Sequence, residues 1–415
     1  MNHSSNSTVI IGGGFVGLFT ALHLQQQNYP DPIILIDQTE RFIFKPLLYE
    51  LLSGEMDDFQ VCPRYDKLLD PEKVQFICDT VEAIDLPQNT LTLKSGTICN
   101  YDKLVIGLGS CSSYFGIEGA KEHTLSFRTR QDAITLKQHL QQCLQRGSEI
   151  QDSQQRRHLL TVAIVGAGPS GVELAATLAD SLPQWYHQRG GNWAEIRLVL
   201  LNQDENILQG DINTELRQAA KTALTDKKVS VELLLNASVT KVQPRQLYYQ
   251  YQEQTHTLEA ATIVWTAGTQ THPLIHSLPI PESHRDKQGR LLLAPTLQLP
   301  HFPNVFVGGD CATILNHPLP PLAQVAYQEG TAIAQNLQAL AHNQKPTHAE
   351  VDIKGSLLKL GLDDSAAQLF DQFVVTGKSA YLIRQGRYLT LLPAPGHDFK
   401  ATTEWLSDEL CSLNF

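Results

Sequence analysis

The chain has 415 residues, of which 42% are hydrophobic and 18% are charged, and its formal net charge is −11. This length exceeds one ordinary hydrophobic core, so we expect two or three domains. The acidic balance argues against nucleic acid as a main partner, because a basic excess is needed to displace counterions from phosphates. The seven cysteines are scattered without a C-x-x-C pair, which fits a reducing compartment and excludes the common zinc spacings.

The segment before Val9 is short and polar, and no run of about 18 apolar residues occurs in the sequence. We therefore expect a cytoplasmic protein with neither a signal peptide nor a transmembrane helix. A peripheral attachment to a membrane stays open, because a local patch can still bind lipid. The fifteen histidines follow no metal-binding pattern, so no metal site is expected.

The first predicted elements are an apolar strand at residues 8–11, a glycine-rich turn and a helix start. Gly12, Gly14 and Gly17 have the G-x-G-x-x-G spacing, in which the glycines permit a tight turn, a pyrophosphate against the backbone and close helix packing. The next apolar strand ends at Asp37, about 20 positions beyond the last glycine, where a carboxylate can bind an adenosine ribose. A glycine turn without a ligand is the alternative interpretation.

The following stretch, residues 41–54, is too apolar for a plain surface loop, so we expect the core or a ligand to cover it. Short apolar stretches at 74–77 and 91–93 predict strands. Residues 101–109 predict a buried strand that ends in two glycines, where backbone can approach a second face of a ligand.

Residues 131–144 predict a helix, and the polar residues 146–158 predict a linker. The opening pattern then returns, because an apolar strand at 160–165 leads into a second G-x-G-x-x-G at residues 166–171 and another helix start. Two such units are far more specific than one. The simplest interpretation is two dinucleotides, one bound by each domain.

After the second unit's next strand, Asn202 occupies the place of the ribose-binding acid. An acid at that point repels the 2′-phosphate of NADPH, so its absence makes NADPH admissible beside NADH. No arginine replaces the acid, so a positive selection for NADPH is not visible. In the alternative interpretation, Asp204 or Glu205 binds the ribose after a small shift.

Residues 261–268 form another apolar strand that runs into a glycine, and residues 303–310 combine a strand, two glycines and an aspartate. The prolines at 320–321 then predict a helix start, since proline at the first helical position loses no hydrogen bond. Gln324 and Gln328 are four positions apart and therefore share one face of that helix.

The tail, residues 346–415, is predicted to hold strands at 373–375 and 381–383. An amphipathic segment is predicted to close the chain, with Phe399, Leu406, Leu410 and Leu413 on one side. The whole pattern predicts an α/β fold with two Rossmann-like dinucleotide-binding domains and a small C-terminal domain.

The chain has two dinucleotide patterns and a late Gly-Gly-Asp. In these features it resembles the flavoproteins with two dinucleotide-binding domains, the superfamily of the pyridine nucleotide-disulfide oxidoreductases. The resemblance covers most of residues 8–345. In that superfamily the first site holds FAD, and the second, inserted between parts of the first, holds NADH or NADPH. The resemblance implies a first part of the FAD-binding domain at 1–120, an NAD(P)H-binding domain at 121–289, a second FAD-binding part at 290–345, and a membrane-side, quinone-side or dimer region at 346–415.

Three segments narrow the resemblance. Residues 44–50, 171–175 and 323–328 are similar to the type II NAD(P)H:quinone oxidoreductases. The longer stretch 44–56 is similar to their plant and cyanobacterial branch, whose members reduce demethylphylloquinone and related prenyl quinones. Disulfide reductases of this fold carry a cysteine pair beside the flavin, whereas residues 42–54 contain no cysteine.

The resemblance implies a non-proton-pumping NAD(P)H:quinone oxidoreductase, in which FAD passes electrons to a prenyl naphthoquinone or plastoquinone. It also implies peripheral contact with a plasma or thylakoid membrane through the C-terminal region, although that region carries few cations. A homodimer stays open. A sulfide-type or other-acceptor reductase, and a redox-sensing flavoprotein like the apoptosis-inducing factors, are the alternatives.

The candidate catalytic residues are Glu173, Gln324 and Gln328. Glu173 lies near a helix start, where the dipole favours its ionised form, and simple helix stabilisation is the alternative. The two glutamines can bind quinone carbonyls or flavin edges without adding charge, and a solvated helix face is the alternative. Implied FAD contacts are Gly12, Gly14, Phe15, Val16, Gly17, Asp37, Gln38, Arg41, Lys45, Pro46, Gly107, Gly109, Gly308, Asp310, Ala323 and Gln324. Implied NAD(P)H contacts are Gly166, Gly168, Pro169, Ser170, Gly171, Glu173, Asn202, Ala267 and Gly268.

Overall fold

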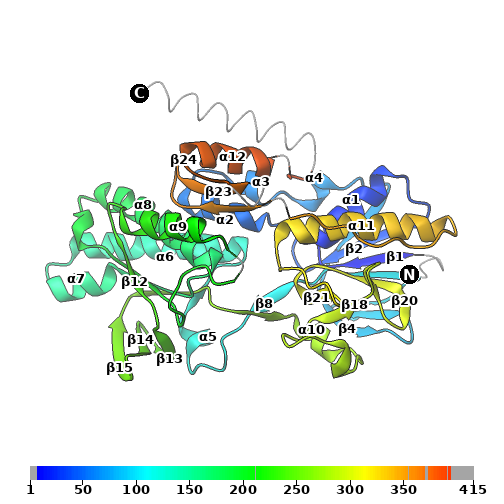
Figure 1. Cartoon of the computed structure of the whole chain (residues 1–415), viewed down its shortest axis with the longest axis horizontal. Helices are drawn as coiled ribbons and strands as arrows, with labels where there is room; N and C mark the ends of the chain where they lie inside the picture. The colour runs from blue at the N-terminus through cyan, green and yellow to red at the C-terminus, as the bar shows by residue number, and fades with distance from the viewer. Residues whose placement is uncertain (1–6, 211, 354, 370–372, 390, 394–415) are drawn as a thin grey trace.

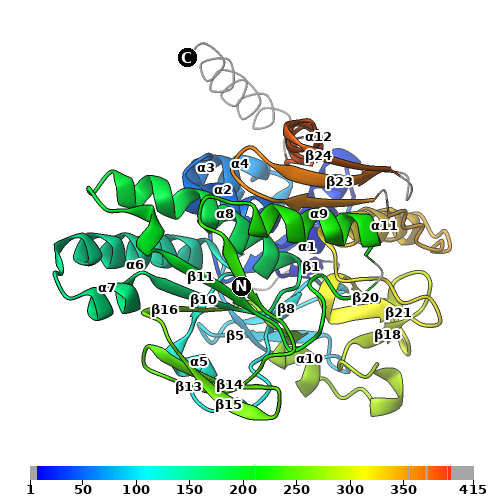
Figure 2. The ribbon, with the colours of Figure 1, turned by 60° about the vertical axis from the view of Figure 1, so that its left-hand side comes forward.

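The computed structural model describes residues 7–210, 212–353, 355–369, 373–389 and 391–393. Two sheets of mainly parallel strands form two lobes, and a smaller C-terminal unit lies against both of them (Figure 1). Helices cover the faces of both sheets, which confirms the predicted α/β class (Figure 2). No helix in the described part of the chain is long and apolar enough to span a bilayer.

The first lobe is built on a six-stranded sheet. Its strands are β1 (Thr8–Ile11), β2 (Ile33–Asp37), β3 (Val74–Cys78), β7 (Lys103–Ile106), β19 (Gln298–Leu299) and β20 (Phe302–Val307). Their order is β19-β20-β7-β1-β2-β3, with all pairs parallel except β19–β20. The central strands are apolar and fully buried because helices cover both faces of a parallel sheet.

Two long helices, α1 (Phe15–Gln26) and α11 (Ala323–Ala341), pack against each other on this sheet. They approach closely at Gly330, where an added Cβ would lie 2.7 Å from the Val16 carbonyl oxygen. The Thr20 hydroxyl lies between them and donates to the Val16 and Gly330 carbonyls. The late segment of the chain therefore completes the lobe that the first residues begin.

The second lobe is built on a five-stranded parallel sheet with the order β12-β11-β10-β16-β9. The strands are β9 (Leu125–Ser126), β10 (Thr161–Val165), β11 (Arg197–Leu201), β12 (Val231–Leu234) and β16 (Thr262–Trp265). Its main helices are α6 (Arg130–Glu149), α7 (Ser153–Leu159), α8 (Pro169–His187) and α9 (Thr214–Thr225).

The lobes are joined by two antiparallel strands, β8 (Ser110–Ser112) and β17 (Thr269–Thr271). Smaller antiparallel sheets comprise β4 (Val81–Asp85), β5 (Thr90–Leu93) and β6 (Ile98–Asn100), then β13 (Ser238–Gln243), β14 (Gln246–Tyr251) and β15 (Gln254–Glu259). β18 (Leu291–Leu293) pairs with β21 (Ala312–Ile314). The short helices are η1 (Lys45–Leu47), α2 (Leu48–Ser53), α3 (Asp58–Val61), α4 (Tyr65–Leu68), α5 (Ala120–His123), α10 (Pro273–Ser277), η2 (Trp193–Glu195), η3 (Glu282–His284) and η4 (Gly309–Cys311).

The C-terminal unit consists of β22 (Ser356–Lys359), β23 (Ser365–Leu369), β24 (Phe373–Gly377) and α12 (Lys378–Leu389). The predicted strand at 381–383 is wrong, because these residues lie inside α12. Tyr381, Arg384, Gln385 and Leu389 are buried together at helical spacing, and a three-residue apolar run cannot distinguish that period from a strand. The predicted amphipathic segment with Phe399 lies outside the described residues.

Two further predictions need correction. The polar residues 146–158 are largely helical rather than a linker, since α6 continues to Glu149 and α7 begins after Asp152. The Asp152 carboxylate caps α7 by accepting from the Gln155 N–H. The prolines at 320–321 precede the helix rather than begin it, because α11 starts at Ala323 with Leu322 as its N-cap.

Candidate active site

The first glycine loop connects β1 to α1 at the carboxyl edge of the sheet. Gly12 has a φ of +86°, and a Cβ there would lie 2.6 Å from the Gly107 carbonyl oxygen. A Cβ at Gly17 would lie 2.0 Å from the Gly12 carbonyl oxygen, so only glycine permits this close turn. Gly107 therefore packs against the loop from the neighbouring strand.

The same loop leaves a cradle for an anion at the N-terminus of α1. Gly14 is exposed, and the nearest atom to an added Cβ there is the Gly107 carbonyl oxygen, 4.0 Å away. The N-cap residue, Gly14, has no side chain to cap the helix, whose first residues are the predicted contacts Phe15 and Val16. Free backbone N–H groups beside open space fit the pyrophosphate of FAD.

Asp37 ends β2 beside this cradle. One carboxylate oxygen accepts from the Gly13 N–H at 2.7 Å, and the other accepts from the Thr39 N–H at 2.8 Å and its hydroxyl at 2.9 Å. Gln38 is exposed at the same edge. Asp37 thus holds the glycine loop and still lies where a ribose can reach it.

A polar group lies where η4, which follows β20, meets β8. The Ser110 hydroxyl donates to the Asp310 carboxylate at 2.7 Å, and Arg128 donates to the Ser110 carbonyl and hydroxyl oxygens at 2.9 Å. Lys45 lies nearby and is partly exposed. Loss of solvent around the side chain lowers the pKa of Lys45, and the charge of Arg128 lowers it further. The charge of Asp310 acts in the opposite direction and raises that pKa. These residues unite both halves of the first lobe with the segment that enters the second.

Beneath Asp310, the buried Glu329 carboxylate of α11 accepts from the Gly309 N–H at 2.6 Å. Burial raises the pKa of Glu329 to about 7, and the neighbouring Asp310 adds to the rise. Gly308 lies directly over this carboxylate, whose Oε2 would be 3.3 Å from an added Cβ. Glu329 therefore fixes the turn that presents Asp310.

The second glycine loop repeats the first in outline. Gly166 has a φ of +104°, and a Cβ at Gly171 would lie 1.8 Å from the Gly166 carbonyl oxygen. Gly168 is exposed with no atom within 4 Å of an added Cβ, and α8 starts without a side-chain cap at Pro169. The exposed Ser170 lies in the same first turn. This second cradle also fits a pyrophosphate.

Asn202 takes the place that Asp37 has in the first lobe. Its Oδ1 accepts from the Ala167 N–H at 3.2 Å, and its Nδ2 donates to the Asn206 carbonyl at 2.9 Å. The amide thus braces the loop without a charge. Ala267 packs against Gly166, and Gly268 follows at the end of β16, so both predicted contacts lie at this edge.

Glu173 lies on α8 and is almost fully buried between the lobes and the C-terminal unit. Its carboxylate accepts from the Lys359 N–H at 2.8 Å. Burial raises the pKa of Glu173 to about 6, although Arg384 and the Tyr49 hydroxyl favour the ionised form. The carboxylate is therefore held by the C-terminal unit rather than by its own helix start.

Gln324 and Gln328 share a face of α11, and Ala323 precedes them at its first position. The Gln324 amide donates to the Gly355 carbonyl at 3.1 Å, and Gln328 exchanges two hydrogen bonds with the Asp352 backbone at 2.9 Å. Both side chains thus hold the segment that leads into the C-terminal unit, an arrangement that differs from a freely solvated face.

The Arg41 side chain binds at α3. Its guanidinium donates to the Cys62 carbonyl at 2.8 Å and pairs with Asp58 at 3.4 Å. Pro46 lies in η1, with its carbonyl bound by Arg384 at 2.7 Å. Gly109 has a φ of +65° and open space around an added Cβ, which leaves room for a ligand beside Ser110.

Residues 6–330 match the pyridine nucleotide-disulphide oxidoreductase family. The chain belongs to this family. A relative from Synechocystis named demethylphylloquinone reductase NdbB is 32% identical over 97% of this chain and 96% of its own length. A type II NADH:quinone oxidoreductase of Staphylococcus aureus is 25% identical over 92% of this chain and 94% of its own.

Solved members and relatives of the family share the fold. The Plasmodium falciparum NDH2 structure in complex with NADH superposes with a TM-score of 0.86 at 17% identity, covering 98% of both chains. The sulfide:quinone oxidoreductase of Aquifex aeolicus superposes with a TM-score of 0.74 at 19% identity, over 94% of this chain and 91% of that one. Likeness of fold alone therefore does not show which substrate donates the electrons.

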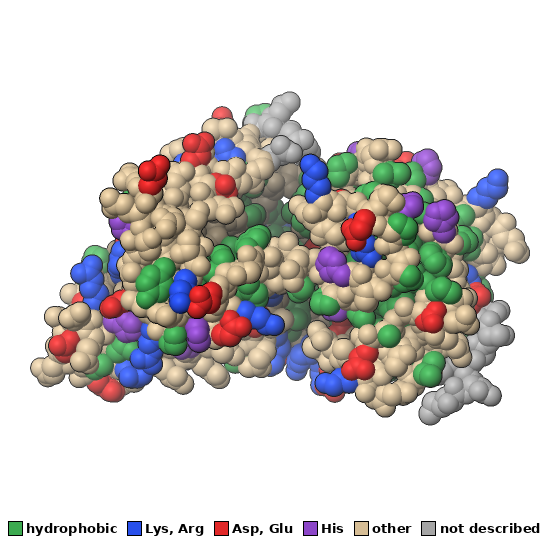
Figure 3. Space-filling view, turned by 90° about the horizontal axis from the view of Figure 1, so that it is seen from below, with side chains coloured by type: hydrophobic (Ala, Val, Ile, Leu, Met, Phe, Trp, Pro, Cys, Tyr) green, Lys and Arg blue, Asp and Glu red, His purple; other side chains and the backbone are tan. Residues whose placement is uncertain are grey.

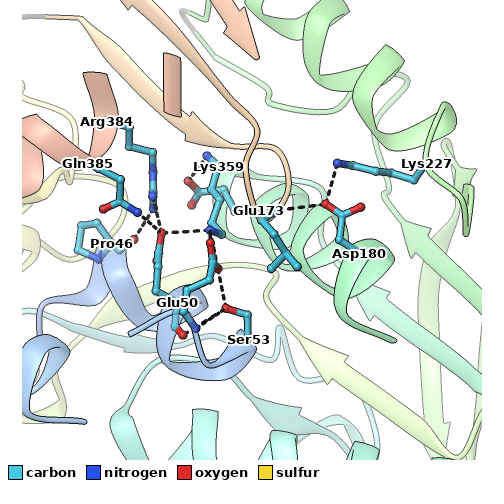
Figure 4. A network of polar contacts seen from close by, with 11 residues as sticks. Pro46, Glu50, Ser53, Glu173, Asp180, Lys227, Lys359, Arg384 and Gln385 are labelled. Atoms are coloured by element: carbon cyan, nitrogen blue, oxygen red, sulfur yellow. Dashed lines mark hydrogen bonds and ion pairs between the residues drawn. The ribbon is translucent and has the colours of Figure 1, made fainter. Parts of the chain in front are cut away.

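Several site residues escaped prediction from the sequence. Arg128, Ser110 and Glu329 meet Asp310 only after the two halves of the first lobe come together. Glu50, Lys359 and Arg384 form a buried charged group that joins the C-terminal unit to α2 (Figure 4). One signal in the sequence could have suggested this group. Glu50 is the single charged residue in the apolar stretch 47–52, and a charged residue in such a stretch is almost never fully buried unless it has a partner of opposite charge.

Proposed function

We propose that the protein is a type II NAD(P)H:quinone oxidoreductase that binds FAD in the first lobe and NADH or NADPH in the second. The single observation that carries this proposal is the pair of open dinucleotide cradles on one chain, joined at β8 and β17 where Ser110 and Asp310 meet. FAD, when bound, supplies the chemistry by accepting a hydride from the nicotinamide and passing two electrons to the quinone.

The protein's own residues supply position and charge. Asp37 and the α1 N-terminus bind the adenosine and pyrophosphate end of FAD, and Asp310 with Ser110 binds the ribityl region. Lys45 offsets negative charge at the redox end. Glu173 orders the contact between α8 and the C-terminal unit, and Gln324 with Gln328 forms one wall of the acceptor site.

We propose that both NADH and NADPH are donors. Asn202 can accept a hydrogen bond from a ribose hydroxyl through its Oδ1, and its neutral amide does not repel a 2′-phosphate. Both Nδ2 contacts point to backbone carbonyls of residues 204 and 206, so the amide offers no donor to that phosphate. The selection between donors is therefore weak.

The acceptor is a prenyl naphthoquinone or plastoquinone, with demethylphylloquinone as the first compound to test because of the Synechocystis relative. The described cysteines do not favour the alternative, a sulfide reductase that uses reactive thiols. Burial raises the pKa of Cys62 and Cys311 to about 12, and all six cysteines in the described ranges are unpaired.

The C-terminal unit is proposed as the side that meets a membrane from the cytoplasm. Phe373, Leu382 and Ile383 are 63%, 41% and 37% exposed on it. On the opposite side, seen from below in Figure 3, basic and acidic side chains are interspersed without a large basic area. Sedimentation with anionic vesicles tests this contact, and unchanged recovery of a Phe373→Ser/Leu382→Ser/Ile383→Ser variant in the vesicle pellet would contradict it.

Anaerobic stopped-flow mixing of the FAD-loaded protein with NADH or NADPH tests the function. We expect both donors to bleach the flavin absorbance and a short-chain naphthoquinone to restore it. Reduction without reoxidation by any naphthoquinone or benzoquinone would reject the quinone acceptor and favour a redox-sensing flavoprotein. Failure of both donors would reject the second cradle as a donor site.

A further inference from the structure

A buried charged pair joins the C-terminal helix to the segment beside the predicted flavin site. Arg384 and Glu50 are both fully buried, and their nearest atoms are 2.5 Å apart. Lys359, also fully buried, lies 3.2 Å from the same Glu50 oxygen and 2.8 Å from Glu55. Figure 4 shows the three side chains converging from β22, α2 and α12.

Arg384 uses its planar fork to hold two points of one turn. One amino group donates to Glu50 at the start of α2, and the other donates to the Pro46 carbonyl in η1 at 2.7 Å. The guanidinium also lies 4.8 Å from the Tyr388 ring centre. A lysine cannot reproduce this fork, because its ammonium is a single point of charge.

The turn that Arg384 holds also carries Lys45. Pro46 follows Lys45 directly in η1, and Lys45 interacts electrostatically with Arg128 and Asp310. Arg384 therefore fixes the backbone of this turn, and the lysine in the same turn lies near enough to Arg128 and Asp310 for their charges to act on its pKa. A shift of η1 would move Lys45 relative to these two residues.

Stability alone is a poor explanation for this pair. Two charges that leave water lose solvation that their attraction only partly restores, and apolar replacements of such pairs are often neutral. Within the described ranges, Arg384 Nε, Glu50 Oε2 and Gln385 Oε1 are buried without a hydrogen-bond partner. An arrangement that leaves these atoms unsatisfied is better explained by the geometry it imposes on η1.

We propose that Arg384, together with Glu50, is a positioning pair that sets the Lys45–Leu47 turn for electron transfer on the acceptor side of the flavin. This inference rests on the proposed function. It makes the C-terminal unit part of the acceptor half of the site, because its helix fixes a turn of the FAD lobe. The donor half is formed around Gly166 and Asn202 in the second lobe, whereas this turn belongs to the first.

The test is the double variant Arg384→Met/Glu50→Leu, which removes both charges and leaves similar volume. We expect bound FAD and flavin reduction by NADH within about twofold of the wild type, with reoxidation by a short-chain naphthoquinone slowed about tenfold or more. The visible flavin band should shift as Lys45 moves. Wild-type reoxidation together with an unchanged band would overturn the proposal.

Two further variants keep the outcome decisive. Arg384→Lys retains the charge but loses the two-pronged hydrogen bonding of the guanidinium, so we expect the same slow reoxidation. Wild-type reoxidation in this variant would refute the proposal. This result is decisive even if the double variant fails to fold. Asp180→Asn/Lys227→Met removes a pair of the second lobe, 2.9 Å apart, that also holds the C-terminal unit: Asp180 accepts from the Leu362 N–H at 3.1 Å, and Lys227 lies 4.0 Å from Asp364. Wild-type half-reactions are expected there, and an equal reoxidation defect would assign the effect to general loosening.

The flavin band needs no quinone, so it tests the positioning pair separately from the proposed function, and the FAD dissociation constant checks that the variants still bind the cofactor. If the wild type is not reoxidised by quinones, the proposed function fails. In that case an unchanged band in Arg384→Lys would also refute the pair, and a shifted band would retain it.

Discussion

The two glycine loops follow the same backbone plan but are fastened by different side chains. Asp37 braces the first loop with a charge, whereas Asn202 braces the second with an amide. Two residues after the third glycine, α1 has Phe19 in an aromatic cluster, and α8 has the buried carboxylate of Glu173. The first loop is also covered by Tyr65, whose hydroxyl donates to the Gly13 carbonyl at 2.8 Å.

This difference fits two nucleotides that are used differently. A charged, covered loop with an apolar helix behind it suits a cofactor that stays bound. A neutral, more open loop suits a co-substrate that leaves after each turnover, because tight ground-state binding does not raise the rate of the chemical step. The following changes exchange or remove the features that separate the loops.

The largest effects are expected from Gly17→Val and Gly171→Val, since each adds a branched side chain within 2.0 Å of a loop carbonyl. We expect Gly17→Val to weaken FAD retention about 100-fold or more, equal to about 2.7 kcal/mol. Gly171→Val should keep FAD but slow flavin reduction to a similar extent. Bound flavin per chain and stopped-flow bleaching measure the two; loss of FAD in both variants would remove the distinction between the loops.

A smaller effect is expected from exchanging the bracing residues. Asp37→Asn removes a charged acceptor, so we expect FAD affinity to fall about tenfold. Asn202→Asp should shift the ratio of kcat/KM for NADH over NADPH about tenfold toward NADH, because a carboxylate repels the 2′-phosphate. Steady-state kinetics with both donors measures the second change, and an unaltered ratio would show that Asp204 or Glu205 reads the ribose instead.

Glu173 has no counterpart in α1, and its titration gives a pH signature. The folded protein retains the proton until about pH 6, whereas the unfolded chain releases it near the ordinary carboxyl value of 4.5. Stability therefore falls as the pH rises through this window, by about 2 kcal/mol. Denaturant unfolding of wild type and Glu173→Gln from pH 4 to 8 measures the difference; parallel curves would contradict the raised pKa.

The smallest effect is expected at the cover of the first loop. Tyr65→Phe deletes one hydrogen bond to the Gly13 carbonyl and leaves the ring packed against Phe76. We expect a loss of about 1 kcal/mol in unfolding free energy and a few-fold weaker FAD binding. Thermal unfolding with and without added FAD checks this, and donor kinetics should not change.

The sequence predicted the α/β class and the glycine loops because backbone requirements leave a local signature at Gly12, Gly17 and Asp37. It missed the contacts of Glu329, Arg128 and Arg384, because their partners are more than fifteen residues away and no local pattern encodes them. The strand predicted at Tyr381 is wrong because a short apolar run fits both the helical and the strand period. The four-segment domain division and the catalytic roles of Glu173, Gln324 and Gln328 stay predictions.

The position of β20 between β19 and β7 has a consequence for biosynthesis. The ribosome makes all strands of the second sheet, up to Trp265, before it makes β20, Asp310 and α11. Until β20 is made, β7 is an edge strand with unpaired backbone groups, which can pair with a strand other than β20. The second lobe, which holds the NAD(P)H cradle, is therefore the first that can fold on the nascent chain. Binding of FAD by the first lobe is a late event, because it depends on the last third of translation.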